Sequence, residues 1–181
     1  RRFDFKDKKS IKKSLHDIDK LLLIRPPAIS KVKRDVFPVI KQARKNNIKQ
    51  IVFLSIQGVE NKPFIPHYKI EQYIKREVIP YTFLRPSFFM QNLVTTHKKE
   101  IKEIEEIFIP ARNGKTNFID IRDIAEVISL VLTKENYKNK TYELTGSKSF
   151  SYYEIADILT DKLNRKIKYI NPSILRFFFF F

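Results

Sequence analysis

The stretch PHYKIE at residues 66–71, followed by YTFLRPSFFMQNL at residues 81–93, predicts a helix and then a buried strand that breaks at a proline. The carboxyl end of such a strand is where an open parallel sheet presents its ligand crevice. Two similar apolar runs come earlier in the chain, at Leu21–Ile24 and Ile51–Ser55. Short, uninterrupted runs of this kind are typical of parallel strands that are buried on both faces. The three runs therefore predict a parallel sheet.

Helical spacing fills the two intervals between these strands. Apolar side chains recur three and four residues apart from Val32 to Ala43, which predicts a helix over residues 30–46. Pro38 lies inside this pattern, so the helix either kinks or begins near it. A second helix is predicted over residues 67–77. The β-α-β-α-β order implies right-handed crossovers and an α/β fold.

Beyond Asn92 the predicted elements become shorter and mixed. Asp120 can cap a helix, and Ser151 with Glu154 forms the capping box of another. Strand candidates lie at residues 108–110, 117–119, 141–145 and 166–170, the first two on either side of a polar turn. The chain ends in five phenylalanines, Phe177–Phe181, which are too few to span a bilayer. We expect truncation or a frameshift there rather than a function.

The composition excludes several classes of protein. The 181 residues include no cysteine, which removes disulfides and thiolate metal sites and suits a cytoplasmic protein. The three histidines, His16, His67 and His97, have no metal-ligand spacing, so no metal site is expected. No apolar run reaches the roughly 18 residues of a membrane span, so no membrane association is expected.

The formal net charge of +16 raises the question of a nucleic-acid partner. The lysines are dispersed along the sequence, and no strand combines aromatic and basic residues as RNA-recognition modules do. A lysine-rich, solvated surface is therefore the favoured interpretation, and nucleic acid is not expected as a partner.

Several of these segments together resemble the NmrA-like branch of the short-chain dehydrogenase/reductase superfamily. The residues that carry the resemblance are FDF at 3–5, LIRPP at 23–27, LRPSFF at 84–89, PARNGKT at 110–116 with FIDIRDIA at 118–125, and YELTG at 142–146. The resemblance implies a Rossmann-like, doubly wound parallel sheet in residues 1–93 that binds NAD or NADP. It also implies a small α+β substrate-binding region in residues 94–181, interleaved with the last sheet elements.

The resemblance also assigns residues to the cofactor and the substrate. By this assignment Asp4 and Phe5 approach the adenine, and Arg25 and Pro26 pass under the ribose and pyrophosphate. Pro86, Ser87 and Phe88 wall the nicotinamide, and Ser55 also belongs to the cofactor site. Phe89 and Asn92 line the substrate. The plainer interpretations are a surface cation for Arg25 and ordinary packing for the two phenylalanines.

The proton chemistry of this superfamily typically depends on a Ser, a Tyr and a Lys, with the Tyr and Lys four residues apart on one helix. Ser55 matches the serine, but His67 stands at the tyrosine position and Glu71 at the lysine position. Their spacing puts both on one helix face, where the Glu71 carboxylate is expected to raise the pKa of His67 and make it a general acid. The alternative is that His67 merely lines the helix start and Glu71 is solvated.

A glycine-rich turn and the helix that follows it hold the pyrophosphate in this family. The glycines here are Gly58, Gly114 and Gly146, and none lies in such an array. We therefore expect a fragment, the second half of a dinucleotide-binding domain, that binds NAD(P) weakly or not at all. The strand at Leu21–Ile24 is then expected to lack a neighbour.

Three functions are compatible with the sequence. The first is an NAD(P)-dependent oxidoreductase that acts on a small carbonyl or quinone. The second is a non-catalytic NAD(P)-binding regulator that senses redox state through a protein partner, which the altered Tyr and Lys positions favour. The third, a basic nucleic-acid-binding module, ranks last because the sequence shows no element that reads bases.

Overall fold

Two compact units make up the chain, in a computed structural model that describes residues 1–180. The first unit comprises Arg1–Pro86 and Ile124–Leu144, and the second comprises Ser87–Asp123 and the residues from Thr145 onward. The first unit therefore ends at Pro86, rather than at the expected residue 93, and a later segment returns to it. The division into a cofactor-binding part and a substrate-binding part stays a prediction.

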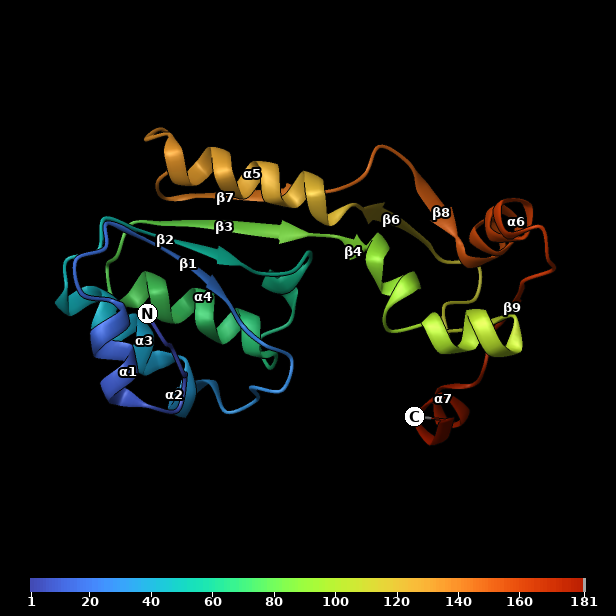
Figure 1. Cartoon of the computed structure of the whole chain (residues 1–181), viewed down its shortest axis with the longest axis horizontal. Helices are drawn as coiled ribbons and strands as arrows, with labels where there is room; N and C mark the ends of the chain where they lie inside the picture. Colours follow the sequence, from blue (N-terminus) through green and yellow to red (C-terminus); the bar gives the residue numbers. More distant parts are fainter. Residues whose placement is uncertain (181) are drawn as a thin grey trace. The chain divides into compact units, whose positions relative to one another are not determined.

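The first unit is built on a four-stranded parallel sheet (Figure 1). Its strands are β1 (Lys20–Ile24), β2 (Gln50–Leu54), β3 (Tyr81–Pro86) and β7 (Lys140–Leu144), in the spatial order β1-β2-β3-β7. All three strand pairs are parallel. The predicted parallel sheet is confirmed, and β1 forms one of its edges.

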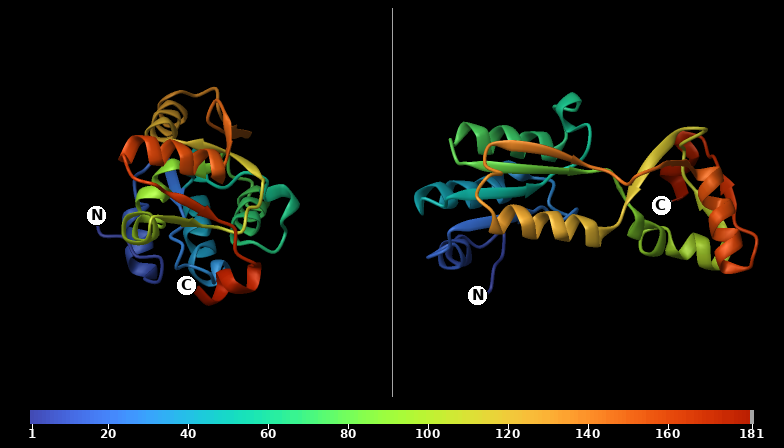
Figure 2. Two further views of the ribbon diagram at one scale, coloured as in Figure 1. Left: turned by 90° about the vertical axis from the view of Figure 1, so that its right-hand side faces the viewer. Right: turned by 90° about the horizontal axis from the view of Figure 1, so that it is seen from above.

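Helices cover both faces of this sheet (Figure 1 and Figure 2). Alternate residues of a strand point to opposite faces. Accordingly, Leu23, Ile51, Phe53 and Phe83 pack in one cluster with residues of α3 (Phe37–Lys45) and α4 (Pro66–Arg76). The intervening Val52 and Leu84 pack with Val131 of α5 (Ile121–Thr133). Full burial of each such side chain stabilises the fold by roughly 1.5–3 kcal/mol, and the doubly wound arrangement follows from it.

The helix predicted over residues 30–46 is divided in two. The short α2 (Val32–Asp35) ends before Val36, and Pro38 lies in the first turn of α3, where a missing N–H leaves no hydrogen bond unmade. Pro38 therefore marks a helix start rather than a kink. A further helix that the sequence pattern did not predict, α1 (Lys8–Ser14), is capped by Asp7, whose side chain accepts from the N–H of Lys9.

The second unit combines short strands with helices. Its strands are β4 (Phe88–Phe89), β5 (Glu106–Phe108), β6 (Lys115–Ile119), β8 (Ser149–Ser151) and β9 (Lys168–Ile170), and its helical elements are η2 (Met90–Val94), η3 (Glu100–Ile104), α6 (Tyr152–Leu163) and α7 (Ile174–Phe180). The strands β5 and β6 flank the predicted polar turn, but they pair with other partners: β5 with β9, and β6 with β4 and β8. The Ser151–Glu154 capping box is present at the start of α6.

One close approach of backbone in the second unit requires glycine. A Cβ atom added at Gly146 would lie 2.0 Å from the carbonyl oxygen of Phe118 in β6. The carbonyl oxygen of Gly146 also accepts from the Asn117 side chain at 3.2 Å. A side chain at this position would push β6 away from the segment that leads to β8.

The C-terminal phenylalanines fall in α7, apart from Phe181, which lies outside the described residues. Truncation or a frameshift there stays a prediction. Within residues 1–180, none of the helices has the length and apolar character needed to cross a bilayer. The expected cytoplasmic location likewise stays a prediction.

Candidate active site

Ser55 lies directly after β2, at the carboxyl end of a central strand. Its backbone N–H donates to the carbonyl oxygen of Leu84 in β3 at 2.7 Å. The residue is 1% exposed, and its hydroxyl has no hydrogen-bond partner among the described residues. Buried polar side chains are nearly always hydrogen-bonded, so an unpartnered hydroxyl at a sheet's ligand-binding edge points to a role in binding or chemistry.

Arg25 follows β1 at the same edge of the sheet. One guanidinium nitrogen, Nη1, donates to the carbonyl oxygens of Pro26, Pro27 and Ile29 at 2.9, 3.1 and 2.7 Å. These bonds hold the side chain over the turn after β1. Its Nε is buried and unpartnered among the described residues, and burial lowers the pKa of Arg25. The guanidinium therefore keeps one donor that no protein group in the described chain satisfies.

His67 is the second residue of α4, after Pro66, and its ring centroid lies 6.0 Å from that of Phe53 in β2. Burial, followed by repulsion from the Arg25 cation, lowers the pKa of His67 to about 4, whereas Glu71 pulls it upward less strongly. Glu71 therefore acts in the expected direction, but burial and Arg25 outweigh it and the net shift is downward. With a pKa of about 4, His67 is neutral at physiological pH, and a role as general acid stays a prediction.

Glu71 is paired with Arg85 of β3. Its two carboxylate oxygens accept from the Arg85 guanidinium at 3.1 and 2.8 Å, and its side chain is 1% exposed. Arg85 also contacts the carboxylates of Glu60 at 2.7 Å and Glu143 at 3.3 Å. The pKa of Arg85 is raised, chiefly by its hydrogen bond to Glu71. The alternative of a solvated Glu71 is wrong, because this carboxylate is buried and bound.

Four other predicted residues of the first unit have structural partners. Asp4 accepts from the backbone N–H of Lys6 at 2.8 Å. Phe5 packs against the core and lines an apolar hollow of about 350 Å³ beside β1. Pro26 is exposed, and the carbonyl oxygen of the buried Pro86 accepts from the N–H of Gln57 at 3.0 Å. A contact of these residues with a cofactor stays a prediction.

The remaining predicted residues belong to the second unit. Ser87 has a buried hydroxyl that finds no partner among the described residues. Phe88 packs edge-to-face on Phe118, with ring centroids 5.3 Å apart, so part of its burial is ordinary packing. Phe89 is half-buried, and Asn92 accepts from the N–H of His97 through its backbone carbonyl at 2.9 Å. The Asn92 side chain makes no hydrogen bond within the described residues, so its amide is free for a ligand.

Comparison with known proteins assigns the chain to a family. Residues 2–177 match the NmrA-like family. The chain belongs to the NmrA-like family. Its sheet is the Rossmann-like one expected for a member, and the resemblance seen in the sequence is confirmed.

Individual relatives extend beyond the chain. It is 29% identical over 168 residues to prestalk A differentiation protein A of Dictyostelium discoideum and 28% identical over 173 residues to an NAD(P)H azoreductase of Xenophilus azovorans, covering 93% and 92% of this chain. It spans only 55% and 59% of those two proteins. Among solved structures, the NADP(H) complex of Citrobacter sp. triphenylmethane reductase superposes with a TM-score of 0.84 at 27% identity, covering 97% of this chain and 64% of the reductase.

Sequence reasoning missed the Arg85 network. The sequence places Arg85 at the end of a predicted strand and indicates no partner for it. Its four partner oxygens come from α4, from the segment after β2 and from β7. The available signal was the period of the strand. Arg85 is two residues after the buried Phe83, so it must share the face that α4 covers, and Glu71 was the acidic residue on that helix.

Proposed function

We propose that this chain provides the catalytic part of an NAD(P)-dependent oxidoreductase that reduces a small carbonyl or quinone. The observation that carries the proposal is the buried, unpartnered hydroxyl of Ser55 at the carboxyl edge of a Rossmann-like sheet. The names of the azoreductase and of the NADP(H)-bound reductase, both relatives in sequence or structure, support the reaction class.

The residues present fit one part of a nicotinamide dinucleotide. Two of the buried, unpartnered donors of the first unit, the Ser55 hydroxyl and Arg25 Nε, follow strands of the sheet at their carboxyl ends. Ribose hydroxyls and phosphate oxygens are natural acceptors for such groups. The three glycines provide no phosphate-binding loop, so the pyrophosphate elements are proposed to lie outside these 181 residues. The choice between NAD and NADP stays open with them.

A nicotinamide cofactor, when bound, would supply the hydride for the reduction. The Ser55 hydroxyl donates to the substrate oxygen as negative charge develops there, and the neutral His67 holds that oxygen through its ring N–H. Since His67 carries no excess proton at neutral pH, the proton that completes the reduction comes from solvent. Ser55 is 1% exposed, so substrate access to its hydroxyl requires a local opening of the groups that bury it.

A second function, a non-catalytic NAD(P)-binding regulator with a protein partner, is favoured by the Glu71–Arg85 pair. Glu71, which stands at the lysine position of the superfamily, forms a structural ion pair with Arg85. It leaves His67 without a hydrogen-bonded carboxylate to support proton transfer. Such a protein binds the cofactor but does not consume it.

Turnover separates the two functions. The complete gene product is incubated with NADPH and a soluble quinone, and cofactor oxidation is followed by absorbance while binding is measured by calorimetry. The enzyme proposal expects quinone-dependent oxidation at rates within the usual enzymatic range of about 1–10³ s⁻¹. Saturable binding without oxidation of NADPH over a panel of quinones and aldehydes would reject it in favour of the regulator. Absence of binding would reject both.

A further inference from the structure

The positive charge of the chain is concentrated near its beginning. Residues 1–49 hold 16 of the 36 lysines and arginines but only five of the 20 aspartates and glutamates. Most of the formal net charge of +16 therefore lies in just over a quarter of the sequence. The lysines are dispersed along the sequence, but the net positive charge is concentrated in residues 1–49.

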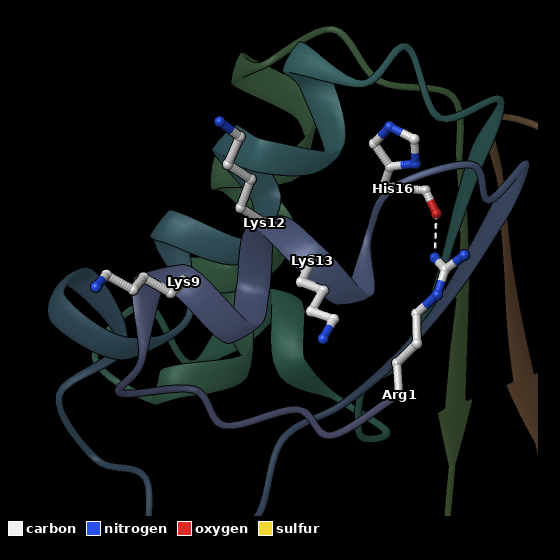
Figure 3. Close-up of a pocket in the computed structure, with 5 residues that line it drawn as sticks. All are labelled: Arg1, Lys9, Lys12, Lys13 and His16. Atoms are coloured by element: carbon white, nitrogen blue, oxygen red, sulfur yellow. Dashed lines mark hydrogen bonds between the residues drawn. The ribbon is translucent and has the colours of Figure 1, made fainter.

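The fold gathers many of these cations around two packed helices, α1 and α3. A hollow of about 500 Å³ is lined by Arg1, Lys9, Lys12, Lys13 and His16. Figure 3 shows the three lysine side chains projecting from α1 and the Arg1 guanidinium turned to the carbonyl oxygen of His16. A second hollow of about 330 Å³ lies between the helices, and its lining includes Lys8, Lys41 and Lys45.

The lysines of this surface, which we call the α1–α3 basic surface, are Lys8, Lys9, Lys12, Lys13, Lys41 and Lys45. Within the described residues, none of them forms an ion pair or a side-chain hydrogen bond. The nearby carboxylates have other partners: Asp17 pairs with His16 at 2.7 Å, Asp19 with Lys49 at 2.8 Å and Asp35 with Arg34 at 2.6 Å. These lysine charges are therefore not neutralised by ion pairs among the described residues, and a polyanion would relieve their mutual repulsion.

We propose that the α1–α3 basic surface binds the phosphate backbone of duplex nucleic acid without reading its sequence. Lysine ammonium groups act as point charges that replace the counterions of phosphates, which is sufficient for sequence-independent binding. Residues of α1 line both hollows, which gives the surface more than one place for a phosphate. Apart from the His16 imidazole, which pairs with Asp17, the residues that line them are not aromatic. The duplex is therefore favoured over a single strand, which needs successive stacking platforms.

The same features argue against two other occupants. Protein interfaces have an apolar or aromatic centre and are depleted in lysine, whereas α1 is formed by KKSIKKS and buries its one apolar side chain, Ile11. A helix that lies on a membrane inserts an apolar face, and α1 has none to offer.

The test measures how salt weakens binding to a fluorescent duplex of about 20 base pairs between about 50 and 200 mM salt. The variant Lys9→Gln, Lys12→Gln, Lys13→Gln is compared with Lys98→Gln, Lys99→Gln, Lys102→Gln. The control changes three exposed lysines of the second unit, which form no ion pairs among the described residues, and it alters the net charge equally. Each lost lysine–phosphate contact lowers the slope of log K against log salt by about 0.9.

We expect the α1 variant to lower that slope by about 2–3 and to weaken binding on the order of ten- to a hundredfold, with the control close to wild type. Equal weakening by both variants would overturn the proposal, because net charge alone would then explain binding. Failure of the wild-type chain to bind the duplex at about 50 mM salt would also overturn it. So would unchanged duplex binding by an α1 variant that has lost binding to phosphatidylserine vesicles.

Discussion

Replacing Arg85 with Met tests the ion pair between Arg85 and the buried carboxylate of Glu71. The change leaves the Glu71 carboxylate, which is 1% exposed, without the guanidinium that now binds both of its oxygens. Removing one partner of a buried ion pair costs about 3–5 kcal/mol, because the remaining charge is buried and uncompensated. We expect the free energy of unfolding at neutral pH to fall by about that amount.

Glu60→Gln is the matched control for this prediction. Glu60 contacts the same guanidinium at 2.7 Å, but its side chain is 50% exposed. Exposed ion pairs contribute about 0–1 kcal/mol, so this variant should lose little. The double variant Glu71→Gln, Arg85→Met should recover much of the loss, because it leaves no charge buried.

Urea denaturation followed by circular dichroism measures all three variants, with the slope m expected to stay unchanged. Equal losses in Arg85→Met and Glu60→Gln, both under about 1 kcal/mol, would refute the reasoning. A double variant that is no more stable than Arg85→Met would refute it as well, since the cost would then not come from the stranded carboxylate.

Three further predictions concern single residues. Ser55→Ala should leave the folding stability unchanged or slightly higher by thermal denaturation, because the hydroxyl has no partner to lose, and a clear fall in the melting temperature would contradict this. His67 should titrate by NMR near pH 4, and a midpoint near 6.5 would refute this. Between these two pH values the unfolded chain binds a proton that the folded chain excludes, so the free energy of unfolding should rise with pH. The variant His67→Gln should flatten that rise. Gly146→Ala should destabilise the second unit by about 1–3 kcal/mol in urea, since its Cβ would meet the Phe118 carbonyl, and wild-type stability would show that β6 can yield.

The parallel sheet could be predicted because its two central strands, β2 and β3, are buried on both faces. A run such as Ile51–Ser55 contains no polar residue until it reaches the sheet edge, and this is the pattern that such burial imposes. The second unit offered no such signal. A strand of three residues, such as β5, is too short to show a period, and its partner β9 lies about 60 residues further along the chain. The helix α1 was missed because Ile11 is the only residue that it buries.

The candidate site could be predicted in position but not in electrostatics. Ser55 was placed at the carboxyl end of its strand because the strand itself was well marked. The pKa of His67 is lowered first by burial and then by Arg25, and neither can be read from the spacing of residues on one helix. Arg25 comes from the turn after β1 and repels the proton, and Arg85 comes from β3 and binds the carboxylate that was expected to attract it. His67 and Glu71 are indeed four residues apart on α4, but this spacing does not reveal that Arg85 of β3 binds the Glu71 carboxylate.

The central claim is that the Ser55 hydroxyl serves chemistry and not structure. The most direct test compares NADPH-dependent quinone reduction by the complete wild-type protein and its Ser55→Ala variant, after both are shown to fold equally well. The account predicts a fall in kcat/KM on the order of 10²–10⁴, the range expected when a group that assists proton transfer or charge stabilisation is removed. Equal rates for the two proteins would contradict it.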